Sequence, residues 1–515
     1  MSDAGGYDSK IYALESVPSP SRANFQFRAV VGSLMLATAL VGLDTNIVNT
    51  ALPRITRDLH GVNHLSWIVT SFMLGQCSVM PIYGKLSDIY GRKRLLIFAI
   101  ILFLLGSGLC GIAHSLVQLA SSRAIQGVGA SGITILASTI AADLAKPEQR
   151  GRLLGLYMGA FAAANLAGPL VGGGITSSLG WRWVFYINLP LGLFVLGCLA
   201  FFFQNTSKAQ KISVDYIGSA LLIASASCFI LNLSLLDSHG TQTKAIIGLF
   251  FVIFIAVTGL LIVQVHRAVE PILAPKLFRY PGFSACIFTS ISVAFPFFGA
   301  VVFMPLYLQV VRGLSPFASG LAMTPQIIGL VISSRAGGWY LARKTNHALL
   351  VNLGVTGVAS GLLLIGVMME LHQNLLCLET ALLILGLGGG LVRPNLIIAA
   401  QTAVSESETG AATSTLIFVH TLSGTAGVAC AQTLMNAGLR AFFVHQSPHF
   451  YAHSKVAEKF DALALGSQTQ GNMVHLAYGS SIAIVFLTSG VIASLGLVCA
   501  QGLGRGRRGG ALSRL

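Results

Sequence analysis

Two ionisable residues interrupt long apolar stretches of the chain and are its strongest candidates for chemistry. Asp44 lies in an apolar run that begins near residue 29, and Arg123 lies in another run over about 118–142. An ionisable group inside an apolar span is costly, so each is a functional hypothesis by default. Burial favours the neutral acid, whereas a nearby cation favours the carboxylate. Such a pair could load and release a proton as its surroundings open and close.

The two residues lie at similar depths if their helices are neighbours. Asp44 is about nine residues from Pro53, or roughly 13 Å along a helix, and Arg123 is about six residues, or roughly 9 Å, from the same side. Gln126 is one of several polar side chains within spans that could line a wet cavity, although hydrogen bonds between packed helices explain such residues equally well. From spacing alone, proton coupling and a static ion pair that only fixes helix packing are equally supported.

The composition indicates which elements position these residues. Hydrophobic residues make up 54% of the 515 residues, charged residues make up 10%, and the mean hydropathy is +0.76. A soluble protein would have too few polar residues to cover that much apolar surface. The apolar runs of roughly 20 residues match the thickness of a bilayer core. The sequence therefore predicts an all-α polytopic membrane protein with the lipid bilayer as its main partner.

Fourteen membrane spans are predicted, and the charges between them indicate their orientation. An even number places both termini on one side, and most of the 32 Lys and Arg residues flank that side. The positive-inside rule therefore predicts cytoplasmic termini. These basic residues lie in short loops and not in a basic soluble domain, so the net charge of +15 does not indicate a nucleic acid partner. The predicted spans are about 29–51, 65–83, 95–113, 118–142, 152–175, 183–203, 215–235, 246–266, 283–308, 317–341, 348–369, 375–400, 410–437 and 478–500.

A tight, charged turn is predicted over residues 84–94, between the second and third spans. Glycines allow the backbone to turn sharply there. One carboxylate among several cations next to spanning helices marks the cytoplasmic side. The candidate residues of this loop are Gly84, Asp88, Gly91, Arg92 and Lys93.

The fifth span contains a second group of backbone-shaping residues, Gly168, Pro169, Gly172 and Gly173. Proline removes a helical hydrogen bond, and glycines allow close helix contact. A plain kink explains the pattern, but broken, glycine-rich helices are also common where bundles rock against each other.

The remaining candidates favour structural explanations. Arg335 and Arg393 lie toward the inner ends of their spans and could snorkel to the cytoplasmic surface. His445, His449 and His453 in the outer loop 441–477 have a spacing that could bind a metal on one helical face. Proline 448 would disturb such a helix, so we favour a solvated His-rich loop and predict no metal site.

Several of these stretches resemble motifs of the major facilitator superfamily, specifically its fourteen-span drug:proton antiporter branch. Residues 84–94 resemble the loop 2–3 signature, with Ile89 where a basic residue is usual. Residues 123–130 resemble the R-x-x-Q-G-x-G-A motif of the fourth span. Residues 155–173 resemble the antiporter motif, with Ala164 where a glycine is usual. Residues 43–53 and 181–190 resemble the fourteen-span branch in particular.

The resemblance implies two six-helix bundles around a central cavity that opens alternately to either side, with two inserted helices between them. It also implies that Asp88 contacts a helix start in the other bundle and latches the cytoplasmic gate in the outward-facing state. It favours proton coupling over the static pair for Asp44 and Arg123. The implied divisions are a cytoplasmic tail 1–28, a bundle 29–203, inserted helices 215–266, a bundle 283–500 and a basic cytoplasmic tail 501–515.

The sequence thus predicts a proton-coupled secondary transporter that exports amphipathic organic compounds or drugs. It predicts no enzyme activity and no cofactor beyond the proton gradient, with protons and a small-molecule substrate as partners. We expect a monomer in the plasma membrane, the inner membrane of a bacterium. The alternative is a proton-coupled transporter of a defined metabolite such as an amino acid, a sugar derivative or an organic anion, since arginines within spans leave room for an anion.

Overall fold

The computed structural model describes residues 20–59, 65–144, 160, 164, 167–203, 215–235, 241–268, 275–343, 346–405, 408–446 and 468–512. These ranges are almost wholly helical and contain no strand. Within them, 11 helices are long and apolar enough to cross a membrane, and Trp67–Met80 and Ile217–Leu233 are shorter apolar helices. The predicted all-α polytopic architecture is confirmed. The number fourteen stays a prediction, because most of the fifth expected span lies outside the described residues.

The first half of the chain and the two helices after it run as follows. The elements are α1 (Pro20–Asp58), α2 (Leu65–Tyr90), α3 (Arg92–Gly111), α4 (Leu116–Leu144), an unlabelled helical stretch over 167–178, α6 (Trp183–Tyr186), α7 (Asn188–Phe202), α8 (Tyr216–Leu235) and α9 (Thr241–Arg267). We call residues 167–178 the fifth helix.

The second half contains longer and more interrupted helices. The elements are η3 (Pro275–Arg279), α10 (Pro281–Val301), α11 (Met304–Leu306), η4 (Tyr307–Val311), α12 (Pro316–Ala322), α13 (Thr324–Arg343), α14 (His347–Glu370), α15 (Leu375–Thr402), α16 (Thr409–Gln446) and α19 (Gln468–Leu512).

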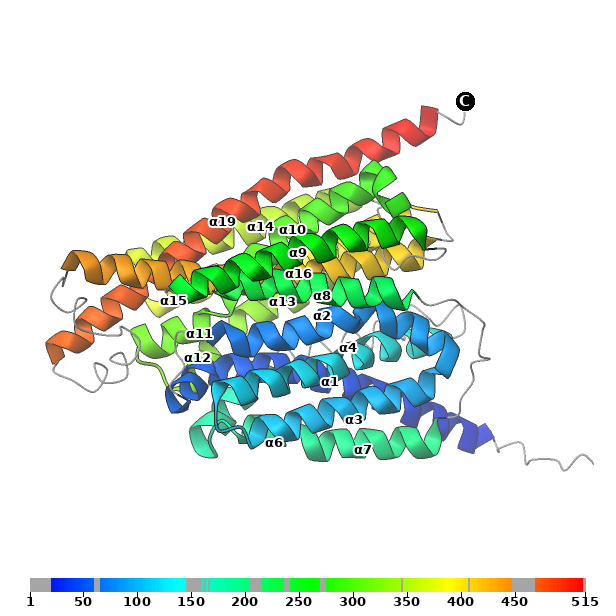
Figure 1. The fold of residues 1–515 in the computed structure, drawn as a ribbon, viewed down its shortest axis with the longest axis horizontal. Coiled ribbons are helices and arrows are strands. Elements are labelled where there is room, and N and C mark those ends of the chain that lie inside the picture. The colour runs from blue at the N-terminus through cyan, green and yellow to red at the C-terminus, as the bar shows by residue number, and fades with distance from the viewer. Residues whose placement is uncertain are drawn as a thin grey trace, which may run out of the picture.

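The most extensive helix packing stays within each half of the chain. Helix α4 packs against α2 and α3, whereas α14 packs against α15 and α19, and α10 against α16 and α19. In Figure 1, α1–α7 lie together below the long helices α10, α14, α16 and α19, and the start of α1 and the end of α19 lie at the same end of the molecule. That placement agrees with an even number of spans.

Helices α8 and α9 form a pair between the halves. They pack against each other, and α8 also contacts α2 and α16. The apolar window of α9 is only 6% buried, which suits a helix facing lipid. This arrangement is consistent with two inserted helices, while the exact bundle boundaries stay a prediction.

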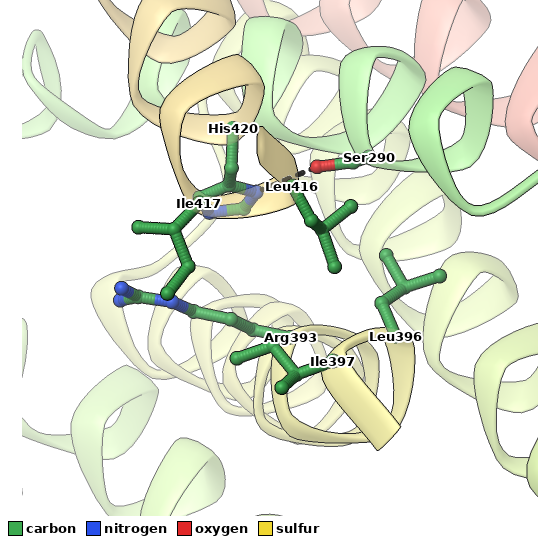
Figure 2. A pocket seen from close by; sticks show the side chains of 7 residues that line it. All are labelled: Ser290, Arg393, Leu396, Ile397, Leu416, Ile417 and His420. Carbon is green, nitrogen blue, oxygen red and sulfur yellow. Dashed lines mark hydrogen bonds between the residues drawn. The ribbon is translucent and has the colours of Figure 1, made fainter. Parts of the chain in front are cut away.

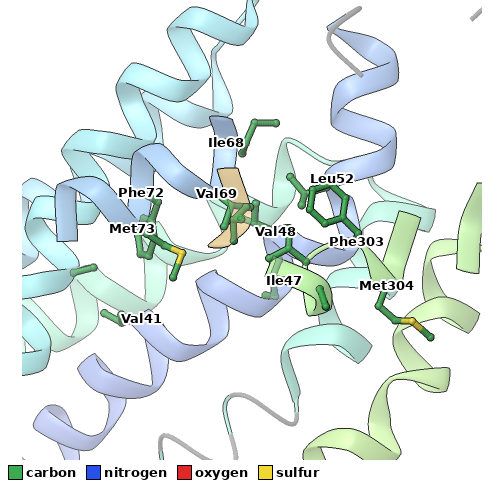
Figure 3. Packing of buried hydrophobic residues seen from close by; sticks show 14 of the residues in the cluster. Val41, Ile47, Val48, Leu52, Ile68, Val69, Phe72, Met73, Phe303 and Met304 are labelled. Atoms are coloured by element: carbon green, nitrogen blue, oxygen red, sulfur yellow. The ribbon is translucent and has the colours of Figure 1, made fainter. Parts of the chain in front are cut away.

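Helix α1 joins the two halves near its C-terminal end. It continues through Pro53 to Asp58, beyond the expected end at residue 51, as spanning helices can when their neighbours accommodate a proline. Figure 3 shows the apolar side chains of this region from α1, α2 and the second half. Val48 and Leu52 belong to the same buried core as Phe303 and Met304, and both of these second-half side chains are fully buried. We call this contact region the joined end.

The predicted turn over 84–94 is wrong in its extent. Helix α2 continues to Tyr90, and α3 already begins at Arg92. Only Gly91 leaves the helical conformation, with φ 87° and ψ 139°. A residue without a Cβ adopts that φ readily, so the direction of the chain changes at one glycine and Gly84 stays helical.

Candidate functional site

Asp44 and Arg123 form an ion pair between α1 and α4. Arg123 Nη1 lies 2.6 Å from Asp44 Oδ2. Asp44 is 0% exposed and Arg123 is 1% exposed. The sequence expectation that the two residues share a depth on neighbouring helices agrees with this geometry.

Two amides complete the surroundings of the carboxylate. Gln126 Nε2 donates to Asp44 Oδ1 at 2.8 Å, and Asn188 Nδ2 donates to the same oxygen at 2.7 Å. Arg123 Nη1 also donates to Gln126 Oε1 at 2.7 Å. Both amides are fully buried. Both oxygens of Asp44 therefore accept hydrogen bonds, from Arg123 and Gln126 of α4 and from Asn188 of α7.

Ser107 on α3 holds the two amides in place. Its Oγ lies 3.2 Å from Gln126 Nε2 and 3.0 Å from Asn188 Nδ2. Its own proton is donated to the backbone oxygen of Phe185 at 2.9 Å. We call Asp44, Arg123, Gln126, Asn188 and Ser107 the polar cluster.

Aromatic side chains close the polar cluster around Arg123. The guanidinium carbon lies 4.0 Å from the ring centroid of Phe72 and 5.8 Å from that of Phe185. Cation–π contacts of this kind are strongest where water is excluded. A buried charge that loses its partner is destabilised by several kcal/mol, so the cluster strongly resists losing either charge alone.

The glycines of the fifth helix place its backbone against both halves of the protein. A Cβ on Gly168 would lie 2.5 Å from Asn46 Cβ, and one on Gly172 would lie 2.8 Å from Ile47 Cα. A Cβ on Gly173 would instead lie 2.5 Å from the backbone oxygen of Pro316, at the start of α12. Close approach of these backbones requires glycine.

Pro169 takes part in the same contact with α12. A Cβ added to Gly320 of α12 would collide with the Pro169 backbone oxygen. The motif that the sequence singled out is thus brought next to the helix that carries Asp44.

The structure describes part of the expected gating loop, and its role as a latch stays a prediction. Lys93 Nζ donates to the backbone oxygen of Ala200 at 2.9 Å, near the C-terminal end of α7, where a cation is favoured by the helix dipole. This contact lies within the first half, whereas the expected latch joins the two halves. Gly91 is buried and Arg92 is half-buried, while the side chain of Asp88 lies outside the described part of the chain.

Arg393 and the other secondary candidates are placed as follows. Arg393 is exposed on α15 and also lines a cavity with Ser290 and His420 (Figure 2). Arg335 is exposed on α13. The His-rich outer loop falls mostly outside the described residues, and no cluster of three or more potential metal-binding side chains occurs within the described ranges.

Sequence reasoning missed two members of the polar cluster. Asn188 lies in the stretch 181–190 that resembles the fourteen-span branch, so that motif was the available signal. Ser107 is a small residue in an apolar run, and nothing in the sequence distinguishes it from the other serines of the spans.

Two packed halves of long apolar helices with a sealed ion pair define the class as a polytopic membrane transporter. The chain belongs to the Major Facilitator Superfamily, whose family model matches residues 34–428. The resemblance found in the sequence motifs is therefore confirmed.

Relatives of known name extend this comparison. The chain is 33% identical over 409 residues to "Multidrug transporter protein MdtP" of Bacillus subtilis (strain 168), covering 79% of this chain and 75% of the relative. It is 34% identical over 400 residues to "Multidrug resistance protein 3" of the same organism, covering 78% of each. It is 31% identical over 422 residues to "Efflux pump dotC" of Dothistroma septosporum (strain NZE10 / CBS 128990), covering 80% of this chain and 72% of the relative.

A solved structure supports the fold. A bacterial homolog of the human lysosomal transporter Spinster superposes with a TM-score of 0.68 at 15% identity, covering 95% of this chain and 99% of that structure. At this identity the likeness shows the fold alone.

Proposed function

We propose that this transporter exports amphipathic organic compounds in exchange for protons by alternating access. Membership of the superfamily and relatives named as multidrug transporters and efflux pumps support the export of such compounds. The single observation that carries the proton role is the fully buried Asp44, which is bound by Arg123, Gln126 and Asn188.

Protonation of Asp44 would destabilise the polar cluster by weakening its hydrogen bonds and removing the counter-ion of Arg123. A protonated carboxyl has an O–H donor in place of one acceptor site, so it cannot keep all three incoming donors equally well. Arg123 would at the same time become a buried cation without its counter-ion. Proton uptake therefore favours a state in which α1 and α4 separate or the guanidinium meets water.

The position of Asp44 on α1 connects this change to the joined end. Asn46 and Ile47, within one turn of Asp44, rest on the glycines of the fifth helix. Thr50 accepts a hydrogen bond at its backbone oxygen from Gln309 Nε2 of η4 at 2.9 Å. A shift of α1 would thus alter the contact between the halves. If the proton binds one conformation more tightly than the other, its binding shifts the populations of the two conformations.

The orientation in the membrane follows from the charge pattern. With both termini in the cytoplasm of a cell whose plasma membrane holds the protein, the joined end is the outer end and this conformation is inward-facing. Asp88 would then act in the opposite, outward-facing state. In this proposal the protein works as a monomer, with two six-helix bundles at 29–203 and 283–500 and the helices of 215–266 between them, and it needs no cofactor besides the proton gradient.

The test is transport of ethidium by the purified full chain in proteoliposomes with an imposed pH gradient. We expect Asp44→Asn to abolish gradient-driven transport. Thr38→Val is a matched control on the same helix, because Thr38 is buried and bonds only to the Leu34 backbone oxygen. Full gradient-driven transport by Asp44→Asn would show that Asp44 does not couple protons.

A transporter of a defined organic anion is the second candidate. Arg393 favours it, because this cation lines a cavity of the second half. Competition of ethidium transport by organic anions and by cationic dyes separates the two candidates.

A further inference from the structure

Three cations gather at one end of the first half, away from the polar cluster. Helices α1 and α3 both contact α7. In Figure 1 the start of α1, the start of α3 and the end of α7 lie at the same end of the molecule. Arg28 comes from α1, roughly four turns before Asp44, and Lys93 and Arg94 come from the first turn of α3. We call these three cations the basic surface.

Two contacts hold the basic surface around the end of α7. Lys93 Nζ donates to the backbone oxygen of Ala200 at 2.9 Å. The rings of Phe25 and Phe202 meet edge to face, with their centroids 5.6 Å apart. Arg28 follows Phe25 by three residues, so it lies on the face of α1 that meets α7. Cations from two helices therefore flank the last turn of α7.

The charge of the basic surface exceeds that of the acids near it. Arg28 and Arg94 are exposed, and neither has an ion pair or a hydrogen bond among the described residues. Residues 25–30 and 196–203 contain no acid, and residues 84–94 contain one acid, Asp88, against four basic residues. A net positive charge therefore remains at this end of the first half, and it is complementary to an anionic group.

An exposed apolar stripe runs from the basic surface along α3. Phe98, Ile101 and Leu105 are exposed and follow Arg94 by four, seven and eleven residues. These intervals place all four side chains on one face of the helix, with the cation at its end. On α7, Phe201 is 86% exposed at the same end of the molecule. A charged end above an apolar stripe matches a phospholipid, which has a charged head group above its acyl chains.

We propose that the basic surface binds the head group of an anionic phospholipid, whose acyl chains lie along the exposed faces of α3 and α7. Arg94 donates to the phosphate oxygens in its planar fork, and Lys93 has donors left beside its bond to α7. With both termini in the cytoplasm, the lipid belongs to the inner leaflet, where anionic lipids attract basic segments. No residue of the polar cluster takes part, so this binding is independent of proton-coupled export.

Native mass spectrometry of the purified full chain measures the lipid preference. The probes are phosphatidylglycerol and phosphatidylcholine with identical acyl chains, titrated separately in detergent without a transport substrate. We expect phosphatidylglycerol to bind at least about fivefold more tightly, since even one Lys or Arg near an anionic head group contributes about that factor. The triple variant Arg28→Gln/Lys93→Gln/Arg94→Gln should bring the two affinities within about twofold of each other.

A matched triple variant removes the same charge elsewhere. Arg267→Gln/Arg279→Gln/Arg335→Gln changes exposed arginines of α9, η3 and α13, and it should keep the preference. Arg28→Gln/Arg94→Gln leaves the hydrogen bond between α3 and α7 in place, and it should weaken the preference even if the first triple variant does not fold. Equal affinities for the two lipids, an unchanged preference in Arg28→Gln/Arg94→Gln, or an equal loss in the matched variant would overturn the proposal.

Quenching by brominated lipids tests where the anionic lipid lies. Phe201→Trp places a fluorescent reporter beside the basic surface, and Val263→Trp places one at an exposed position about one turn before the end of α9. Relative to the parent protein, phosphatidylglycerol with brominated chains should quench Phe201→Trp at least about twofold more strongly than brominated phosphatidylcholine. The two lipids should quench Val263→Trp alike. Equal quenching of Phe201→Trp by the two lipids would overturn the location.

Discussion

Asn188 and Asp44 are 144 residues apart in sequence, yet Asn188 Nδ2 lies 2.7 Å from Asp44 Oδ1. The contact joins the start of α7 to the middle of α1. It adds a third donor to a carboxylate that already accepts hydrogen bonds from Arg123 and Gln126. The site is therefore a hydrogen-bond network between α1, α4 and α7 and not an isolated ion pair.

Removal of the Asn188 amide should weaken this network without removing a charge. We expect Asn188→Ala to reduce gradient-driven transport by about tenfold, since losing a hydrogen bond to a charged group is worth roughly 1.5–3 kcal/mol. The measurement is initial transport rate in proteoliposomes at fixed protein content. Asn232→Ala is the control, because buried Asn232 donates only to the Cys228 backbone oxygen of its own helix. Equal effects of the two variants would contradict the role of Asn188.

The two charges of the polar cluster should be strongly coupled in stability. Arg123→Leu or Asp44→Leu alone leaves an unpaired buried charge, which costs about 3–5 kcal/mol. The double variant Asp44→Leu/Arg123→Leu should be more stable than either single variant, although it should not transport. Thermal unfolding of the parent protein, the two single variants and the double variant in detergent measures this coupling. Additive losses in the double variant would mean that the two side chains act independently.

Neighbouring glycines of the fifth helix should respond very differently to the same added methyl group. A Cβ on Gly172 would lie 2.5 Å from Thr50 Oγ1, whereas one on Gly174 would have only Phe317 Cδ2 nearby, at 3.9 Å. We expect Gly172→Ala to lower stability by about 1–3 kcal/mol and to impair transport, as overpacking does. Gly174→Ala should match the parent protein in both measurements. Transport and stability like the parent in Gly172→Ala would show that α1 can move aside without consequence.

A tether outside the spans should be stable at neutral pH and weaken only in acid. Ser405 Oγ donates to Glu408 Oε2 at 2.7 Å, and Tyr280 Oη donates to the same oxygen at 3.0 Å. These hydrogen bonds hold the pKa of Glu408 below its ordinary value of 4.5. Since the depressed pKa favours the carboxylate, the stabilisation is present above pH 4.5 and is lost as pH falls through the lowered pKa.

Hydrogen exchange of the segment before α16 measures this tether. Between about pH 5 and 8, protection corrected for the intrinsic rate should stay constant, since Glu408 remains ionised throughout. Within that pH range Glu408→Gln should reduce protection, and Tyr280→Phe should do so to a smaller extent. A transition near neutral pH would indicate another titrating group.

Charge and hydropathy in the sequence predicted the helical architecture and the depths of Asp44 and Arg123. The depths were predictable because a charged side chain within an apolar span is costly unless it faces the interior of the bundle and has a partner there. The extent of α2 was not predictable, since Gly84 and Gly91 look equivalent until the neighbouring helices determine which one leaves the helix. Ser107 and Asn188 were missed because their importance depends on which residues face them across helix interfaces. Arg393 was expected to reach the surface and is exposed, but its place in a cavity with Ser290 and His420 could not be predicted, because these residues come from other helices.

Gly172 and Gly173 are successive residues, and successive positions on a helix point about 100° apart. One turn of the fifth helix therefore touches α1 on one side and α12 on the other through backbone atoms, with no side chain of its own between them. The fifth helix itself therefore adds few side chains that would have to change rotamer. Rotation of one half against the other at this point is limited instead by bonds such as that between Gln309 and Thr50 and by the buried side chains of the joined end, Val48, Leu52, Phe303 and Met304.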